Sequence, residues 1–400
     1  MRKILLYFLC LNCIFFICKN SYCQRSPYII SIEKELTNIK PTGLKEIGST
    51  IIYIPLETSK ECFLKDLIKI VVTDSYIAVQ DLDKILLFDI SGHFISEIGK
   101  RGRGPGEYQG WISDFCFSLD GNKIYLLSTG GNNYICMEFD VKGFFIRSYQ
   151  LDSKYIRMIP LKDNLFVFHP NNAHKDRDPI LHSLVISDLQ NNIQKTYKNH
   201  HKLTVENSRI GYVGGSSFYS YKGNMRFREF GADTIFTVTE KGLLPYAIFS
   251  LGKKLMPVDI FVPANFLLSD GSVNLDRLLR PHEGKYFLTS AREDVDNIYF
   301  RLEDWRKSLL GFFSKRSNTV KIIGVEGFQN DINGGLPFFP KYAYDDILFD
   351  YVNAFDMREH ALRKNVDEMK KLYGKNWDDL IKLVNSLNDE SNPIVVMIRK

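Results

Sequence analysis

A unit of about fifty residues recurs along this chain, and internal repetition constrains a fold more than any other sequence pattern. Residues 86–95 (LLFDISGHFI) superpose on residues 137–146 (MEFDVKGFFI) with a shift of 51 positions. Both segments read as strand, two-residue turn and strand, with Gly92 and Gly143 supplying the positive φ that tight hairpins require. The same frame predicts three later hairpins, with Asn191, Gly242 and Asn318 in the glycine position.

Each unit contains several short runs of β-branched and aromatic residues. In the first unit these runs are Ile68–Val72, Tyr76–Gln80, Lys84–Asp89 and Phe94–Ile98. Four short strands in about 40–50 residues are typical of a β-propeller blade, and the near-regular period disfavours a β-sandwich. Five hairpins and one closing unit predict an all-β, six-bladed β-propeller over residues 49–400, with an insertion near 254–282.

A ring of blades needs strands from both chain ends, because an open ring would leave unpaired backbone groups at its edges. Ile51–Leu56 and Ile394–Ile398 are the candidates for this closure. A helical region at about 354–387 precedes the second of them. Its first half predicts one helix ending at Gly374, with Leu362, Val366, Met369 and Tyr373 on one face. A second helix is predicted from Leu380, Leu383, Val384 and Leu387.

Residues 1–23 have the pattern of a secretory signal: Arg2 and Lys3, then an apolar run from Ile4 to Cys18, then a polar exit. We therefore expect export to the periplasm or cell envelope, with residues 24–48 as an N-terminal extension. Anchoring as an outer-membrane lipoprotein through Cys23 or Cys18 is the alternative. A permanent membrane helix is disfavoured because a membrane span needs about 20 apolar residues.

The charge and the cysteines narrow the classes of partner and site. The formal charge is +5, and removing the signal takes away Arg2, Lys3 and Lys19, so the remaining +2 gives no clustered basic surface for nucleic acid.

Four of the seven cysteines lie in the signal. The other three are Cys62, Cys116 and Cys136. We expect them to be buried apolar residues, with a disulfide between Cys116 and Cys136 as the alternative.

Several ordered motifs resemble one known family. Residues 98–108 (IGKRGRGPGEY) resemble the glycine-rich loop of bacterial envelope proteins called the 6-bladed β-propeller family, relatives of NHL-repeat propellers. Weaker similarities follow that family's order along the chain, at 54–58 (IPLET), 233–235 (DTI), 244–247 (LPYA) and 392–396 (NPIVV). The resemblance implies a six-bladed ring in the envelope, often with a lipid anchor. It implies no particular activity and no catalytic residues.

The glycine-rich loop supplies the candidate ligand-binding residues. It lacks the GK[ST] sequence of a phosphate loop, and β-structure rather than a helix follows it, so we interpret it as a crossover between blades one and two. Such a crossover would lie at the mouth of the ring, where anionic or sugar-like ligands could meet the candidates Arg101, Arg103, Glu107, Tyr108 and Trp111.

A metal site is the rival hypothesis. Enzymatic propellers hold one ion in the channel with acids and histidines, so a calcium- or zinc-dependent, lactonase-like hydrolase or lyase is the alternative function. The weak metal candidates are Asp114, His169 and His174. No cofactor is predicted otherwise. We therefore expect an exported binding module that recognises a protein, small-molecule or glycan ligand through loops on one ring face, with membrane contact only through a lipid anchor.

Overall fold

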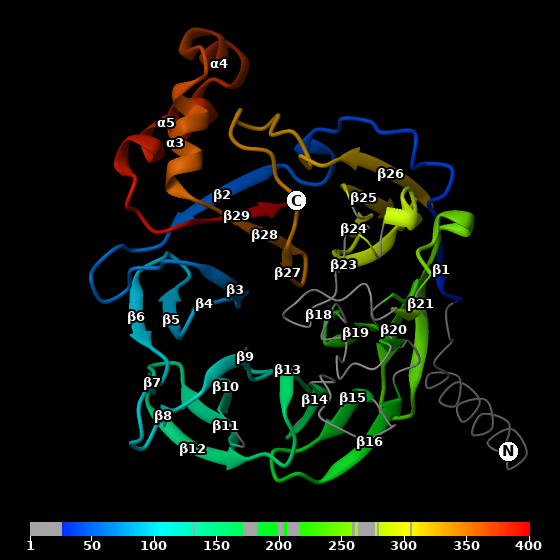
Figure 1. The fold of residues 1–400 in the computed structure, drawn as a ribbon. Coiled ribbons are helices and arrows are strands. Elements are labelled where there is room, and N and C mark those ends of the chain that lie inside the picture. Colours follow the sequence, from blue (N-terminus) through cyan, green and yellow to red (C-terminus); the bar gives the residue numbers. More distant parts are fainter. Residues whose placement is uncertain are drawn as a thin grey trace, which may run out of the picture.

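Six β-sheets surround a central axis (Figure 1). The computed structural model describes residues 26–400 apart from 131–132, 163, 171–181, 199–203, 206–216, 230, 258–260, 263–276, 278–279 and 305. Each of these six sheets has four antiparallel strands, one of them with an added fifth strand described below, and the first strand of each lies nearest the axis. The predicted six-bladed β-propeller is thereby confirmed. The predicted signal at 1–23 lies outside the described residues.

The first three blades follow one another along the chain. Blade one contains β3 (Leu67–Val72), β4 (Tyr76–Asp81), β5 (Lys84–Asp89) and β6 (Phe94–Glu97). Blade two contains β9 (Trp111–Phe117), β10 (Lys123–Gly130), β11 (Asn133–Asp140) and β12 (Phe145–Gln150). Blade three contains β13 (Tyr155–Lys162), β14 (Leu165–Pro170), β15 (His182–Ser187) and β16 (Ile193–Lys198).

The last three blades complete the ring. Blade four contains β18 (Ser217–Tyr221), β19 (Asn224–Arg228), β20 (Thr234–Val238) and β21 (Leu243–Ser250). Blade five contains β23 (Phe287–Glu293), β24 (Asn297–Glu303), β25 (Ser308–Ser314) and β26 (Thr319–Gly324). Blade six contains β27 (Tyr342–Tyr344), β28 (Ile347–Val352), β29 (Ile394–Arg399) and, from the other chain end, β2 (Thr50–Pro55).

Short elements lie outside these blades. Two parallel strand pairs are β7 (Lys100–Arg101) with β8 (Glu107–Tyr108), and β17 (Thr204–Val205) with β22 (Phe261–Val262). The described residues also include the 3-10 turns η2 (Leu44–Glu46), η3 (Gly252–Lys254) and η5 (Arg280–His282).

Strands from both chain ends close the ring, as predicted. The antiparallel register of β2 and β29 runs from Thr50 opposite Arg399 to Pro55 opposite Ile394. The buried amide of Asn392 reinforces this closure. Its nitrogen donates to the carbonyls of Glu57 (2.6 Å) and Cys62 (2.8 Å), and its oxygen accepts from the Leu64 amide (2.8 Å). This bonding gives a physical reason for the Asn-Pro motif before the closing strand.

The N-terminal extension forms part of the sheet structure, which the sequence did not predict. Its strand β1 (Tyr28–Ser31) pairs in parallel with β21 and makes blade four five-stranded. Ile30 and Ile32 are fully buried there. Further along, Leu44 is buried and its amide donates to the Gln329 carbonyl (2.8 Å). The segment therefore joins the rims of blades four to six.

Four of the five predicted hairpin positions have the expected backbone conformation. The φ angles are +91° at Gly92, +86° at Gly143, +69° at Asn191 and +56° at Asn318. The prediction for Gly242 was wrong, because this glycine does not have a positive φ. The Thr239 hydroxyl accepts from the Gly242 amide (3.0 Å) and donates to its carbonyl (2.8 Å), so a side chain closes this turn.

The helical insertion lies between β28 and β29, as predicted, but it has three helices rather than two. These are α3 (Ala354–Leu362), α4 (Val366–Tyr373) and α5 (Lys375–Ser386). Leu362 is 71% exposed and Val366 is 59% exposed, so they do not form the predicted buried face. Asn365 caps α4 and separates the two halves of that pattern. Among the residues that the structure describes, no helix is long and apolar enough to cross a membrane.

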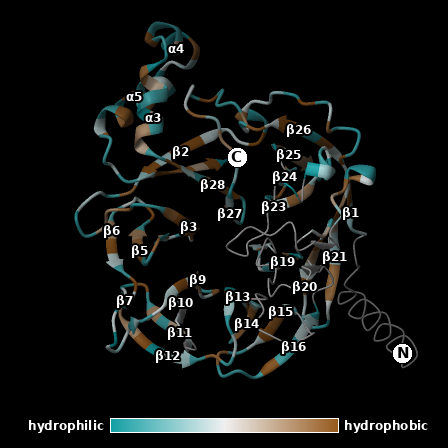
Figure 2. Ribbon diagram, viewed as in Figure 1, coloured by the Kyte–Doolittle hydropathy of each residue, from teal (hydrophilic) through white to brown (hydrophobic). Residues whose placement is uncertain are grey.

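The core lies between and within the blades, where apolar residues concentrate along the strands (Figure 2). Aromatic rings join adjacent blades, for example Phe249 with Phe300 at 5.3 Å and Tyr125 with Phe166 at 4.9 Å. Cys62, Cys116 and Cys136 are buried and free, so the alternative of a disulfide was wrong. The two strands that carry Cys116 and Cys136 are separated by β10.

Candidate functional site

The antiparallel order of the strands gives the ring two different faces. The first-to-second and third-to-fourth strand connections lie on one face, which we call the tight-turn face; it includes turns 73–75, 118–122, 222–223, 294–296 and 345–346. The opposite face, the long-loop face, carries the blade-to-blade connections and the helical insertion. Its described long segments include 98–110, 325–341 and 353–393.

The glycine-rich loop lies on the long-loop face and is held by its own residues. The Glu107 carboxylate accepts from the Gly104 amide (2.8 Å), and a Cβ on Gly102 would lie 2.0 Å from that carboxylate. Tyr108 is 2% exposed, and its hydroxyl donates to the Asp83 carbonyl. Glu107 and Tyr108 therefore shape the loop, and the buried Tyr108 side chain is not presented to solvent.

Four of the five predicted ligand-binding residues remain exposed and only Tyr108 is buried, although the Glu107 carboxylate is bonded within the loop itself. Arg101 and Arg103 are exposed, and Trp111 is 67% exposed at the start of β9. The Arg101 guanidinium lies 5.4 Å from the centre of the Trp111 ring. At an exposed site such a cation–π contact stabilises by about 0.5–1 kcal/mol. The pair thus forms a flat, cationic surface beside the crossover.

The metal candidate Asp114 links three blades. One carboxylate oxygen accepts from the Lys69 ammonium of blade one (2.5 Å), and the other accepts from the Met158 amide of blade three (2.8 Å). Asp114 itself is 3% exposed. Both oxygens therefore have structural partners.

The histidine candidates are not brought into a metal site. His169 is buried, its Nδ1–H donates to the Ser183 carbonyl (2.7 Å), and burial lowers the pKa of its imidazole. His174 lies outside the described residues. In the part of the chain that the structure places, no three His, Cys, Asp or Glu side chains form a group that could hold a metal ion.

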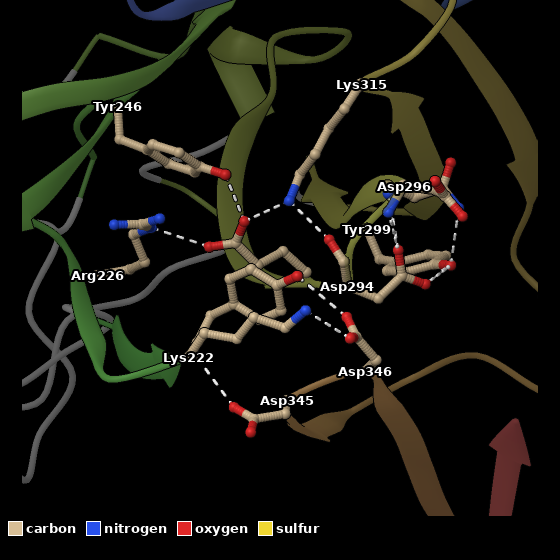
Figure 3. Close-up of polar contacts among 12 residues, drawn as sticks. Lys222, Arg226, Tyr246, Asp294, Asp296, Tyr299, Lys315, Asp345 and Asp346 are labelled. Atoms are coloured by element: carbon tan, nitrogen blue, oxygen red, sulfur yellow. Dashed lines mark hydrogen bonds and ion pairs between the residues drawn. The ribbon is translucent and has the colours of Figure 1, made fainter. Parts of the chain in front are cut away.

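A buried ionic cluster centred on Glu293 lies at the tight-turn face (Figure 3). The fully buried Glu293 carboxylate accepts from Arg226 Nε (2.8 Å), from Lys315 Nζ (2.5 Å) and from the Tyr246 hydroxyl. Burial lowers the pKa of Lys315 more than the Glu293 carboxylate raises it. Burial and the same carboxylate raise the pKa of Tyr246. The cluster joins blades four and five.

A second carboxylate organises the adjoining turn. Asp294 is fully buried and accepts from the Tyr299 hydroxyl (2.8 Å) and from the amides of Asp296 and Asn297 (2.7 Å each). The Lys400 ammonium lies 3.2 Å from the same carboxylate. The turn of blade five is therefore fixed by residues of its own blade and of the chain end that closes blade six.

Blades four and six also contact each other directly at this face. The Lys222 ammonium lies 2.7 Å from the Asp346 carboxylate, which also accepts from the Tyr221 hydroxyl (3.0 Å). The Lys222 amide donates to Asp345 (2.9 Å). Figure 3 shows these residues beside the Glu293 cluster. Blades four and six are thus joined across the ring at the tight-turn face by these ion pairs and hydrogen bonds.

A cavity lies on the long-loop face. Its volume is about 770 Å³, and it lies between α3 and blade six. Cavities of about 300–1,000 Å³ are the usual size of small-molecule sites. Apolar residues contribute part of the wall, and Phe355 in this wall is 52% exposed. The other apolar wall residues are Leu336, Pro337, Tyr351 and Val352.

The polar residues of this cavity carry both signs of charge. Its acids are Glu326, Asp356 and Glu359, and its bases are Lys341, Arg363 and Lys364. His360 Nε2–H donates to the Gly334 carbonyl (3.0 Å), and burial lowers the pKa of its imidazole. The ammonium of the lining residue Lys341 lies 3.2 Å from the carboxylate of Asp350. Burial raises the pKa of this carboxylate to about 6. The mixed lining suits a polar ligand with both donors and acceptors.

Sequence reasoning missed both the Glu293 cluster and the cavity. Arg292, Glu293 and Asp294 follow one another at a strand end, and such a charged triplet is more often a solvated turn. Only the contacts with blade four show that Glu293 is buried. The helical insertion was the available signal for the cavity, but the sequence does not place its helices against the 325–341 connection.

Two solved structures illustrate what the fold is similar to. A protein of Bacteroides fragilis NCTC 9343, described as a "Putative exported protein", has a TM-score of 0.65 at 15% identity, over 94% of this chain and 100% of that one. The β-propeller domain of the Trilobed protease from Pyrococcus furiosus has a TM-score of 0.34 at 12% identity, over 71% of this chain and 76% of that one. The first likeness shows a shared fold, and the second is too weak to support an argument.

No curated protein matches the sequence. A family of proteins does match it across almost the whole chain, from residue 27 to residue 399. The matched range contains β1, all six blades and the helical insertion. This chain therefore belongs to the family described as "Domain of unknown function (DUF4934)".

Proposed function

We propose that this protein is an exported binding module that recognises its ligand at the long-loop face. The observation that carries this proposal is the cavity of about 770 Å³ between α3 and blade six. Blade six contributes one wall, and the helical insertion and the 325–341 connection contribute the others. Binding residues on loops held by a rigid scaffold are a common arrangement in proteins.

The exposed residues of the glycine-rich loop are a second contact region on the same face. Arg101, Arg103 and Trp111 offer a guanidinium surface and a ring on which a sugar or a planar group could stack. Glu107 and Tyr108 act indirectly, because they fix the loop that carries the other three. The ligand is a protein, a small molecule or a glycan rather than nucleic acid.

Export is the second part of the proposal. The pattern of residues 1–23 supports it, and so does the description of the Bacteroides fragilis protein with the similar fold. The mature protein would act in the periplasm or at the cell envelope, and a lipid on Cys23 or Cys18 would attach it to the membrane. No observation favours a metal-dependent hydrolase or lyase, and the function proposed requires no cofactor.

Site-specific photo-crosslinking in the native host tests the binding face. A photoreactive amino acid replaces Phe355 in one strain and Trp111 in another. The matched control replaces Leu119, which is 58% exposed on the tight-turn face. We expect a discrete adduct from positions 355 and 111 in the envelope fraction, and none from position 119. The absence of adducts at 355 and 111, or the same adducts from position 119, would refute the proposal.

A further inference from the structure

The glycine-rich loop on the long-loop face carries cations that the protein does not pair with its own acids. Lys100, Arg101 and Arg103 are exposed, and none of them forms an ion pair within the described part of the chain. The acids of the same segment are held elsewhere: the Glu107 carboxylate accepts from a backbone amide of the loop (2.8 Å), and Glu97 is half-buried at the end of β6. The loop therefore presents unpaired positive charge to solvent.

Arg101 and Trp111 lie together beside this loop. The Arg101 guanidinium lies over the Trp111 ring, 5.4 Å from its centre, and Trp111 nevertheless remains 67% exposed. A guanidinium that lies over a ring keeps its N–H donors free, because they point outward in its own plane. Among the residues that the structure describes, Arg101 donates no hydrogen bond. The pair therefore offers a ligand an open aromatic surface and a set of charged donors next to it.

The backbone that carries this pair is already fixed. β7 pairs with β8, where Arg101 lies opposite Tyr108, and the Gly102 amide donates to the Tyr108 carbonyl (3.0 Å). The Tyr108 hydroxyl donates to the Asp83 carbonyl of blade one. Trp111 begins β9, the inner strand of blade two. Binding at this pair therefore requires little ordering of the main chain, which favours affinity.

We propose that Arg101 and Trp111 form a subsite for an acidic sugar residue. The indole stacks on the pyranose ring, and the guanidinium binds the carboxylate or sulfate group of the same residue. Such a residue carries its anion on the ring that stacks, which fits an aromatic ring and a guanidinium 5.4 Å apart. An acidic peptide has the anion without the flat ring, and in a nucleotide the ribose separates the base from the phosphate.

This inference rests on the proposed function, because it names the ligand class of the second contact region on the long-loop face. Isothermal titration calorimetry with four defined probes tests it. Tetragalacturonate and a sulfated carrageenan tetrasaccharide have rings and anions, maltotetraose has rings without charge, and tetraglutamate has carboxylates without rings. We expect one acidic tetrasaccharide to bind at least about tenfold more tightly than maltotetraose and tetraglutamate. The tighter of the two identifies the preferred anion.

Two variants and two matched controls assign this binding to the subsite. Trp111→Ala removes the ring and Arg101→Gln removes the charge, and each should weaken binding of the preferred tetrasaccharide by about tenfold or more. The controls are Phe144→Ala and Lys142→Gln, in the turn between β11 and β12 on the tight-turn face of the same blade. Phe144 is 68% exposed, which matches the exposure of Trp111, and Lys142 is exposed as well. Both controls should keep the wild-type affinity.

Three results would overturn the inference. The first is that neither acidic tetrasaccharide binds more tightly than maltotetraose, and the second is that tetraglutamate binds as tightly as they do. The third is that Trp111→Ala or Arg101→Gln keeps the wild-type affinity, or that the controls lose as much. None of these results is the failure of the proposed function, which photo-crosslinking measures with any ligand. Adducts at positions 355 and 111 without tetrasaccharide binding would keep the binding face and reject the acidic-sugar subsite.

Discussion

Single buried polar side chains hold neighbouring blades in register in this ring. Asp114 joins three blades, and Glu293 joins two. Asn392 joins the closing strand to the segment after β2. Each of these groups is almost or fully buried. When one of them is removed, its former partners lose a hydrogen bond that water cannot replace. The stability of the ring therefore depends on a few polar residues as well as on apolar packing.

The first prediction concerns Glu293→Gln. The change keeps the shape of the side chain but leaves the buried Arg226 and Lys315 without a counter-charge. Breaking a buried ion pair in this way costs about 3–5 kcal/mol. We expect the free energy of unfolding, measured by urea titration, to fall by about 3 kcal/mol. The control is Glu240→Gln at the exposed pair with Lys162, where no resolvable change is expected. Equal effects at the two sites would contradict the structure.

The second prediction concerns the pH dependence that Asp350 contributes. Burial raises its pKa to about 6, above the value near 4 of an unfolded aspartate. Between these values the folded state binds the extra proton, so the contribution of Asp350 to stability falls as the pH rises from about 4 to about 6. Asp350→Asn removes this contribution. The free energy of unfolding of Asp350→Asn minus that of the wild type should therefore increase as the pH rises from about 4 to about 6, by up to about 3 kcal/mol.

Urea titrations of both proteins between pH 4 and pH 7 measure this difference. Other titrating groups are common to the two proteins and cancel in the comparison. A difference that stays constant from pH 4 to pH 7 would show that Asp350 has an ordinary pKa. A difference that moves in the opposite direction would show that the Lys341 ammonium outweighs burial.

At the scale of elements, the hairpins show which positions a sequence repeat can fix. The repeat identified the turns at Gly92 and Gly143 because only a residue with positive φ fits there. It failed at Gly242, where the Thr239 hydroxyl supplies the turn bonds instead. Glycine is compatible with many conformations, so its place in a pattern does not prove that a left-handed one is needed.

The third prediction separates contact from backbone strain with a matched pair of glycines. Gly92 and Gly121 both have positive φ, at +91° and +71°. A Cβ on Gly92 would lie 2.2 Å from the Pro55 carbonyl of β2, whereas a Cβ on Gly121 would meet nothing within 4 Å. Gly92→Ala should therefore lower the free energy of unfolding by about 1–3 kcal/mol more than Gly121→Ala. Equal losses in urea titration would mean that the blade-one hairpin does not pack on β2.

The helical insertion shows the limit of periodicity. The spacing of Leu362, Val366 and Met369 is that of one helix face, but the chain breaks between α3 and α4 at the cap residue Asn365. Leu380 and Val384 of the predicted second helix do pack, as part of α5, and they lie against Trp377 of the same helix and Met357 and Ala361 of α3. A heptad-like pattern cannot show whether a capping residue within it ends the helix.

At the scale of the whole molecule, local patterns predicted the ring but not the contacts between distant segments. Blade number and closure followed from the repeat and from the need to pair both chain ends. The β1 strand, the Glu293 cluster and the cavity depend on pairs far apart in sequence, such as Ile30 with Phe249 or Arg226 with Glu293. No spacing in one sequence identifies such partners. The glycine-rich segment joins blades one and two as the crossover interpretation expected, but the burial of Tyr108 was not predictable from its sequence.

The last prediction tests closure by removing one strand from each chain end. Deleting 394–400 removes β29, which lies between β28 and β2, so blade six loses its third strand and β2 loses its partner. Deleting 26–48 removes β1 but leaves all six four-stranded blades. We expect the wild type to unfold in a single cooperative transition when followed by circular dichroism, and the first variant to lose that transition. The second should keep that transition at a lower midpoint, because it exposes the edge of β21. A cooperative transition near the wild-type midpoint without β29 would mean that the ring does not depend on pairing of its two ends.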